Sequence, residues 1–238
     1  MPTPDNHVRT QVLQRLQSLH RAGVLSFPRP PVSETIEENA PLETANGDNS
    51  DALRALNEEV CQCTLCPELV RNRSRTVFGV GNPRPRLCFF GEGPGADEDR
   101  LGEPFVGAAG KLLNKIISAM GLRREDVYIL NVVKCRPPGN RTPTETEVDN
   151  CRPFFARQLA ILQPEFICCL GGCAAQTLLQ SNLPVGRLRQ QFHSYENASV
   201  MVTYHPAYLL RRPEEKTKTW SDMKMLMREM GIVVKSKD

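Results

Sequence analysis

Short apolar runs alternate with helix-like patterns along the chain from about residue 51 onward. Four of these runs are short and bounded by turn residues, which predicts buried strands. Between and after them, apolar residues recur at the spacing of amphipathic helices. This alternation predicts an α/β domain with a mostly parallel sheet and helices on both faces. The predicted strands are 87–90, 127–133, 165–170 and 199–203, and the predicted helices are 107–121, 145–162, 173–179 and 220–230.

Polar residues and glycines follow all four predicted strands. Parallel strands share one edge for their carboxyl ends, and ligands of such sheets bind outside that edge. The sequence therefore predicts an active site there. The residues concerned are the stretch 91–95, Asn131, the pair Gly171 and Gly172, and the run Tyr204, His205 and Pro206.

The stretch GEGPGADED at 91–99 is the most unusual of these segments. Gly91, Gly93 and Gly95 let a ligand approach the backbone closely. The glycine spacing differs from that of phosphate-binding loops, and no lysine follows where those loops have one. Glu92 and the acidic residues at 97–99 would also repel a phosphate. The stretch therefore favours a neutral planar ligand, or a site that needs a general base.

The first 50 residues differ in composition from the rest. Apolar residues in 7–25 recur near helical spacing, which predicts an amphipathic helix. Such a helix either docks on an unknown protein partner or packs on its own domain, and the second interpretation is favoured. Residues 26–50 combine prolines with polar and acidic residues, as linkers do. We therefore predict an N-terminal extension over 1–50 and a folded domain over 51–238.

Composition narrows the class of protein further. The net charge is only +3, so any affinity for nucleic acid must come from local basic patches. No apolar run approaches the length of a membrane span, and the N-terminus lacks the apolar core of a signal peptide. Nine cysteines without an export signal indicate reduced thiols or metal ligands. These features predict a cytoplasmic protein that does not bind membranes.

Four of the cysteines lie among charged and turn residues. Cys63 and Cys66 form a C-x2-C pair, and Cys135 and Cys151 lie 16 residues apart. Two pairs brought together by the fold would form a four-thiolate site for Zn²⁺ or an iron–sulfur cluster, and spacing does not separate the two. Cysteines on predicted core elements are instead expected to be small buried residues. These are Cys88, Cys168, Cys169 and Cys173.

Two segments after predicted strands carry basic residues suited to phosphates. The first is a proline-rich loop after Asn131, and the second follows His205. Bulky side chains beside arginines in the second segment are typical of a wedge between stacked bases. Alternatively, its leucines begin the packing of the last helix. The predicted DNA contacts are Lys134, Arg136, Arg141, Tyr208, Leu209, Leu210 and Arg211.

The motifs GEGPGADED, EPFVG, NVVKCRPPGNRTP and HPAYLLR, with four cysteines in this order, closely resemble those of the family 4 uracil-DNA glycosylases. The resemblance runs from about Cys63 to Met230. It implies a three-layer α/β/α sandwich around a four-stranded parallel sheet. It also implies a monofunctional base excision repair enzyme that flips uracil out of single- or double-stranded DNA and hydrolyses its N-glycosidic bond. A monomer is expected.

The resemblance also assigns roles to individual residues. It implies that Glu92 and Gly93 form a loop around water and uracil, and that Glu98 supports this loop and is needed for activity. Phe105 is implied to stack on uracil, and Asn131 to hydrogen-bond its edge. His205 is implied to stabilise charge on uracil O2. The implied ligands of a [4Fe–4S] cluster are Cys63, Cys66, Cys135 and Cys151.

Two rival interpretations remain distinguishable. A related uracil-DNA binder that traps its product through a histidine is disfavoured, because the loop after Asn131 contains Asn140 and no histidine. A non-catalytic DNA-binding or redox module with a metal cluster would bind DNA without Glu92 or His205.

The resemblance also places Gly93 where more distant relatives have a water-activating Asp, so the identity of the general base stays open.

Overall fold

The computed structural model describes residues 49–233. The predicted helix at 7–25 and nearly all of the predicted linker at 26–50 lie outside the described residues. The first described element is helix α2 (Asn49–Gln62), which begins close to the expected start of the folded domain. Within the described range, no helix combines the length and apolarity that a membrane span requires.

The described residues form one mixed sheet of six strands in the order β1-β3-β2-β4-β6-β5. The four predicted strands are its parallel centre, since β2 pairs in parallel with β3 and β4, and β4 with β6. The expected four-stranded parallel sheet is therefore wrong in its extent, because a short antiparallel strand is added at each edge. The strands are β1 (Val80–Gly81), β2 (Leu87–Gly91), β3 (Tyr128–Asn131), β4 (Phe166–Leu170), β5 (Phe192–Tyr195) and β6 (Ala198–Thr203).

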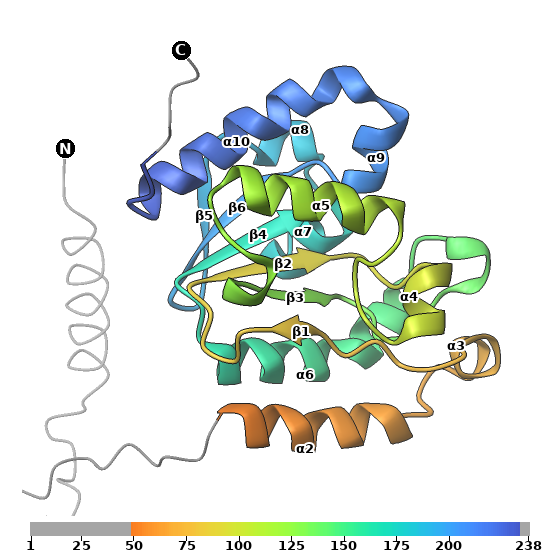
Figure 1. The fold of residues 1–238 in the computed structure, drawn as a ribbon. Helices are drawn as coiled ribbons and strands as arrows, with labels where there is room; N and C mark the ends of the chain where they lie inside the picture. The colour runs from red at the N-terminus through yellow and green to blue at the C-terminus, as the bar shows by residue number, and fades with distance from the viewer. Residues whose placement is uncertain (1–48, 234–238) are drawn as a thin grey trace, which may run out of the picture. The chain divides into compact units, whose positions relative to one another are not determined.

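Helices cover both faces of this sheet, as the alternation predicts (Figure 1). The predicted bounds of α6 (Glu145–Leu162) are confirmed at both ends. Its N-terminus is capped reciprocally, since Thr144 Oγ1 accepts from Glu147 N and Glu147 Oε2 accepts from Thr144 N. The further helices are α3 (Pro67–Asn72), α4 (Ala96–Leu101), α5 (Ala108–Ala119), α6 (Glu145–Leu162), α7 (Gly172–Leu179), α8 (Val185–Leu188), α9 (Pro206–Arg211) and α10 (Lys216–Glu229).

Two hydrophobic cores lie on opposite faces of the sheet, because side chains of a strand alternate in direction. Phe90 packs on one side in a core that includes residues of α2, α6, α7 and α8. Phe89 packs on the other side with residues of α5 and α10. Both phenylalanines are fully buried, and Figure 1 shows α2 and α6 on one side of the sheet and α5 and α10 on the other. The sheet is thus a rigid, doubly covered platform.

The carboxyl ends of the four parallel strands meet at one edge of this platform. Gly91 at the end of β2 pairs with Asn131 at the end of β3, and Leu170 of β4 pairs with Thr203 of β6. His205 follows Thr203 by two residues. The predicted convergence of polar residues at this edge is confirmed.

Candidate active site

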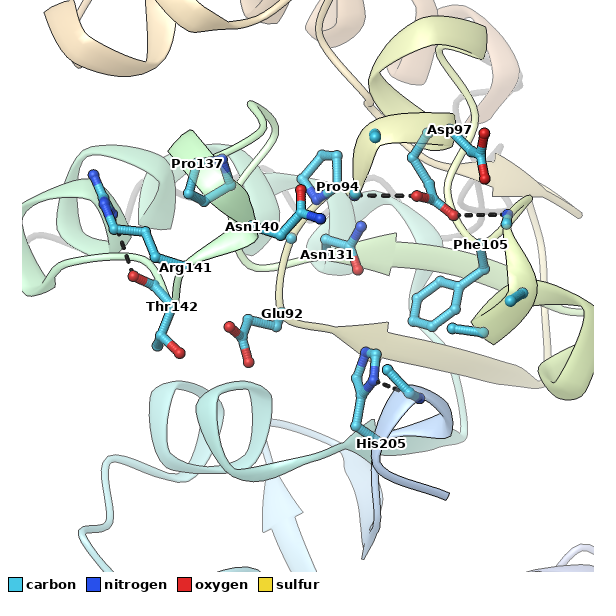
Figure 2. A pocket seen from close by; sticks show the side chains of 18 of the residues that line it. Glu92, Pro94, Asp97, Phe105, Asn131, Pro137, Asn140, Arg141, Thr142 and His205 are labelled. Atoms are coloured by element: carbon cyan, nitrogen blue, oxygen red, sulfur yellow. Dashed lines mark hydrogen bonds between the residues drawn. The ribbon is translucent and has the colours of Figure 1, made fainter. Parts of the chain in front are cut away.

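A cavity of about 560 Å³ opens at this edge of the sheet. Figure 2 shows Glu92, Phe105, Asn131 and His205 around it, with the loop of Pro137 to Thr142 on one side. The structure thus brings together residues from the loop after β2, the end of β3, the loop before α5 and the start of α9. Predicted site residues that line the cavity are Glu92, Gly93, Glu98, Phe105, Asn131, Arg141, His205, Tyr208 and Arg211.

The carboxylate of Glu98 fixes two loops of the cavity. Its Oε2 accepts from Gly95 N at 3.1 Å, and its Oε1 accepts from Val106 N at 2.9 Å and Gly107 N at 3.0 Å. These bonds join the GEGPG loop to the segment of Phe105, which has a positive φ of 53°. Such a backbone conformation is costly for a non-glycine residue and persists only where surrounding contacts impose it. Glu98 therefore positions Phe105.

Replacing Glu98 by glutamine is expected to lower the free energy of unfolding by about 1–3 kcal/mol. The amide has one acceptor oxygen, so at least one of the three backbone N–H groups loses its partner. Denaturant titration measures the change. Asp97→Asn, on the same helix but largely exposed, is the matched control and should change the free energy of unfolding by less than about 0.5 kcal/mol. Equal values for both variants would contradict this role of Glu98.

His205 enters the cavity as a neutral hydrogen-bond donor. It caps α9, and its Nδ1 accepts from Ala207 N at 3.1 Å. Burial, assisted by the positive charge of Arg211 and opposed by Glu98, lowers the pKa of the imidazole to about 4. Because a neutral ring carries one proton and Nδ1 is an acceptor, the proton resides on Nε2. The Phe105 ring lies 5.5 Å from the His205 ring, centroid to centroid.

Gly171 supports His205 from behind. Its φ is +95°, a conformation that side-chain-bearing residues rarely adopt, and a Cβ there would approach His205 Cβ to 3.0 Å. The sequence places Gly171 at a strand end but does not reveal this contact. Glycine is therefore required both for the turn after β4 and for the position of His205.

Asn131 presents an unsatisfied acceptor to the cavity. The residue is 1% exposed, and no described residue hydrogen-bonds its Oδ1. Its backbone oxygen accepts from Lys134 Nζ at 2.8 Å. A Cβ on Gly91 would overlap Asn131 Oδ1 and lie 2.7 Å from the Phe105 ring, so this glycine makes room for both side chains. A buried acceptor without a donor costs about 1–3 kcal/mol, so this oxygen is suited to accept from a group that enters the cavity.

Glu92 lies between the Thr142 loop and His205 in Figure 2. Burial raises the pKa of its carboxyl above the ordinary 4.5, while a hydrogen bond with Thr142 opposes the rise. The neighbouring Gly93 borders the cavity through its backbone, and a Cβ there would approach Val133 Cγ2 to 2.8 Å. Thr142 carries no signal in the sequence pattern that would have identified it as a partner of Glu92.

The predicted DNA contacts are corrected at two positions. Lys134 is 1% exposed, because its chain turns inward and its amine bonds the Asn131 carbonyl. Leu209 is also 1% exposed, whereas Leu210 is 44% exposed. Neither Lys134 nor Leu209 is available to DNA in this structure.

The arginines of the proline-rich loop are engaged by neighbours. Arg141 forms ion pairs with Glu68 and Glu147 at 2.9 and 2.7 Å, which bind the loop to α3 and α6. Arg136 Nε donates to Asn140 Oδ1 at 2.8 Å. Arg141 therefore holds the loop in place, and much of its charge is already balanced.

The four predicted ligand cysteines come from three separate segments. Cys63 and Cys66 precede α3, Cys135 follows β3, and Cys151 lies within α6. Burial raises the pKa of the Cys135 thiol, and the nearby Cys63 and Cys66 raise it further. Burial likewise raises the pKa of the Cys151 thiol, and Cys135 and Cys66 add to that rise. The four thiols are thus electrostatic neighbours. Among residues 49–233, no three Cys, His, Asp or Glu side chains lie close enough to hold one metal ion.

Hydrogen bonds to sulfur support this group of thiols. Arg73 Nη1 donates to Cys135 Sγ at 2.9 Å and its Nη2 to the Cys63 carbonyl at 2.9 Å. Asn150 Nδ2 donates to Cys66 Sγ at 3.4 Å. Three of the cysteines predicted to be core residues are fully buried in strands, as expected, whereas the fourth is half-buried at the start of α7. They are Cys88, Cys168, Cys169 and, in α7, Cys173.

Comparison with known proteins agrees with this fold and site. The family model of the Uracil DNA glycosylase superfamily matches residues 78–224. This range contains the six strands and every residue that lines the cavity. The chain is therefore a member of that superfamily.

Individual relatives define the family within it. A type-4 uracil-DNA glycosylase of Archaeoglobus fulgidus is 42% identical over 184 residues, which is 74% of this chain and 92% of the relative. One of Thermotoga maritima is 44% identical over 163 residues, 68% of this chain and 84% of the relative. A type-5 uracil-DNA glycosylase of Thermus thermophilus is 31% identical and aligns with 52% of this chain and 71% of its own length. The chain belongs to the type-4 uracil-DNA glycosylases.

Proposed function

We propose that the chain excises uracil from DNA by hydrolysing the N-glycosidic bond, leaving an abasic site for base excision repair. Membership of the type-4 family supports this function. The observation that carries it is that one cavity is lined both by the buried Asn131, whose amide oxygen has no hydrogen-bond partner, and by a neutral His205. Uracil offers a donor at N3 and acceptors at O2 and O4, which match these two groups.

Asn131 is proposed to distinguish uracil from cytosine. Its Oδ1 can accept from uracil N3–H while its Nδ2 donates to O4. Cytosine reverses both groups, with an acceptor at N3 and an amino group at C4, and would leave both hydrogen bonds unmade. Phe105, whose ring borders the cavity, offers a flat surface on which the base stacks. The base reaches this site only after it is flipped out of the stack, which costs a few kcal/mol.

His205 is proposed to stabilise the departing uracil. When the C1′–N1 bond breaks, its electron pair leaves with the base and negative charge develops on O2. The Nε2–H of a neutral imidazole donates to that oxygen, and its direction is already fixed through Nδ1. Glu92 orients the water whose oxygen bonds to C1′, and the proton of that water passes to the carboxylate or to solvent. Departure of the base leads the reaction, so weak basicity of Glu92 suffices.

Four neighbouring thiols from three segments are the donor set that a [4Fe–4S] cluster would use. We propose Cys63, Cys66, Cys135 and Cys151 as its ligands. When bound, the cluster supplies a structural cross-link between α3, the loop after β3 and α6. Thiolate donors and N–H groups directed at two of the sulfurs support this assignment. Arg136, Tyr208, Leu210 and Arg211 are proposed to contact DNA.

The single-turnover rate of uracil release is expected to fall on the acid side as Glu92 becomes protonated. Because burial raises the pKa of this carboxyl, the fall should lie above pH 4.5. His205 does not account for this fall, because its pKa is lowered to about 4 and the ring is neutral above that pH. The neighbouring Cys173 has a pKa raised to about 12 and stays protonated throughout. Glu92→Gln should therefore remove this fall in rate on the acid side. A fall at the same pH in this variant would contradict the role assigned to Glu92.

The proposed function is tested with oligonucleotides that carry one uracil, thymine or cytosine at the same position. Abasic sites revealed by alkaline cleavage should form only in the uracil strand. Single- and double-stranded forms should both be tested. A non-catalytic DNA-binding module would bind all three oligonucleotides and generate no alkali-labile site, which would contradict the proposal.

A further inference from the structure

A buried carboxylate lies on α10, outside the cavity. Asp222 is fully buried, and its Oδ2 accepts from Thr203 Oγ1 at 2.7 Å. The Arg189 guanidinium donates to Oδ1 at 2.9 Å and to Oδ2 at 3.2 Å. The Arg189 side chain is itself only 8% exposed. Residues from the end of α8, the end of β6 and α10 are thus joined by three hydrogen bonds.

This group contacts the segment that leads to His205. Thr203 is the last residue of β6, and its backbone oxygen accepts from Gly171 N at 2.9 Å, the glycine on which His205 rests. The Arg189 guanidinium lies over the Tyr204 ring at 5.5 Å from its centroid. Both residues that precede His205 are therefore held by the buried ion pair, one through its hydroxyl and the other through its ring.

A buried ion pair is a poor way to gain stability alone, because desolvation of both charges offsets most of their attraction. What such a pair does provide is a fixed geometry. A guanidinium and a carboxylate can form two parallel hydrogen bonds only within a narrow range of relative orientations. An apolar pair would attach α10 to the sheet equally well but would leave Thr203 free to rotate. The arrangement thus fixes the direction in which the chain leaves β6.

We propose that Thr203, Asp222 and Arg189 are positioning residues that hold His205 in the orientation needed for excision. They do not touch the cavity and act through the backbone of Thr203 and through Tyr204. The proposal rests on the role of His205 in the proposed function. A shift of about 1 Å at a catalytic donor can lower a rate by as much as about 100-fold, so small changes in this group should be measurable.

Thr203→Val is the sharpest test, since valine has the shape of threonine without its hydroxyl, and Thr203→Ser is the matched control that keeps the hydroxyl. We expect Thr203→Val to lower the single-turnover rate of uracil release by about 10-fold, with the Kd for uracil-containing DNA changed by less than about 2-fold. Thr203→Ser should stay within about 2-fold of the original rate. Arg189→Lys, which keeps the charge but loses the planar fork, provides a second variant of the same kind.

A double-mutant cycle separates an effect that acts through the position of His205 from a loss of activity that is independent of His205. In a His205→Ala background, Thr203→Val should lower the remaining rate by less than about 2-fold, because residues that act through a shared partner are non-additive. An undiminished 10-fold loss in that background would overturn the proposal.

The orientation of His205 can also be followed without activity. The chain has four histidines, so an NMR titration can resolve the ring of His205. The Thr203→Val substitution should raise the pKa of this ring from about 4 toward the ordinary 6.5 as its burial is relaxed, and Thr203→Ser should not. An unchanged titration in Thr203→Val would overturn the positioning role, whereas a chain that releases no uracil would overturn the proposed function.

Discussion

His205→Ala is expected to lower the single-turnover rate of uracil release by about 100- to 1000-fold, which corresponds to loss of one preorganised donor to a developing oxyanion. The neutral ring, with Nδ1 occupied by Ala207 N and the proton on Nε2, is suited to this task. DNA binding should change little, because the donor acts on charge that develops only as the glycosidic bond breaks. Rapid-quench measurement with enzyme in excess isolates this step.

His205→Gln is the matched control, since an amide N–H can replace part of the lost donor. It should retain more activity than the alanine variant. Both should fold, with the melting temperature of the alanine variant lowered by about 2–4 °C because the cap of α9 is lost. If His205→Ala released uracil at the original rate, the proposed role of the imidazole would be wrong.

Cys135→Ala is expected to lose iron and solubility and to lower the melting temperature by about 10 °C or more, because the free energy of metal binding contributes directly to folding. The Cys135 thiol, on the loop after β3, is an electrostatic neighbour of Cys63, Cys66 and Cys151. Iron analysis, visible absorbance and thermal unfolding measure these three effects.

Cys61→Ala provides the control, because Cys61 is exposed and lies only two residues from Cys63. It should keep both iron content and melting temperature. A Cys135→Ala protein with a full complement of iron would contradict the ligand assignment. A colourless, zinc-loaded and fully active preparation of the unaltered chain would contradict the cluster itself.

The sequence predicted the central elements because burial on both faces leaves a strong local pattern. The strand at 87–90 is an unbroken apolar run, and the helix at 145–162 shows apolar residues at helical spacing. The edge strands lacked such a signal. β1 has two residues, and β5 (Phe192–Tyr195) is only half-buried with an exposed position, so tertiary pairing decides their conformation.

Only part of the candidate site could be predicted from the strand pattern of the sequence. The convergence of Asn131 and His205 follows from the parallel arrangement of the four predicted strands, whose carboxyl ends lie at one edge of the sheet. The roles of Phe105 and Glu98 came only from family resemblance, because the structure joins segments whose contacts no local pattern records. Lys134 was assigned wrongly to the surface, since a basic residue in a proline-rich loop carries no sign of the direction of its side chain.

The most direct test of the central claim is the quantity of free uracil released from an oligonucleotide that contains one uracil, measured with the cluster-loaded chain in single turnover. We predict one uracil released per oligonucleotide, with the strand intact until alkali is added. Tight binding of that oligonucleotide with no uracil released would contradict the assignment of this cavity as a uracil-excising site.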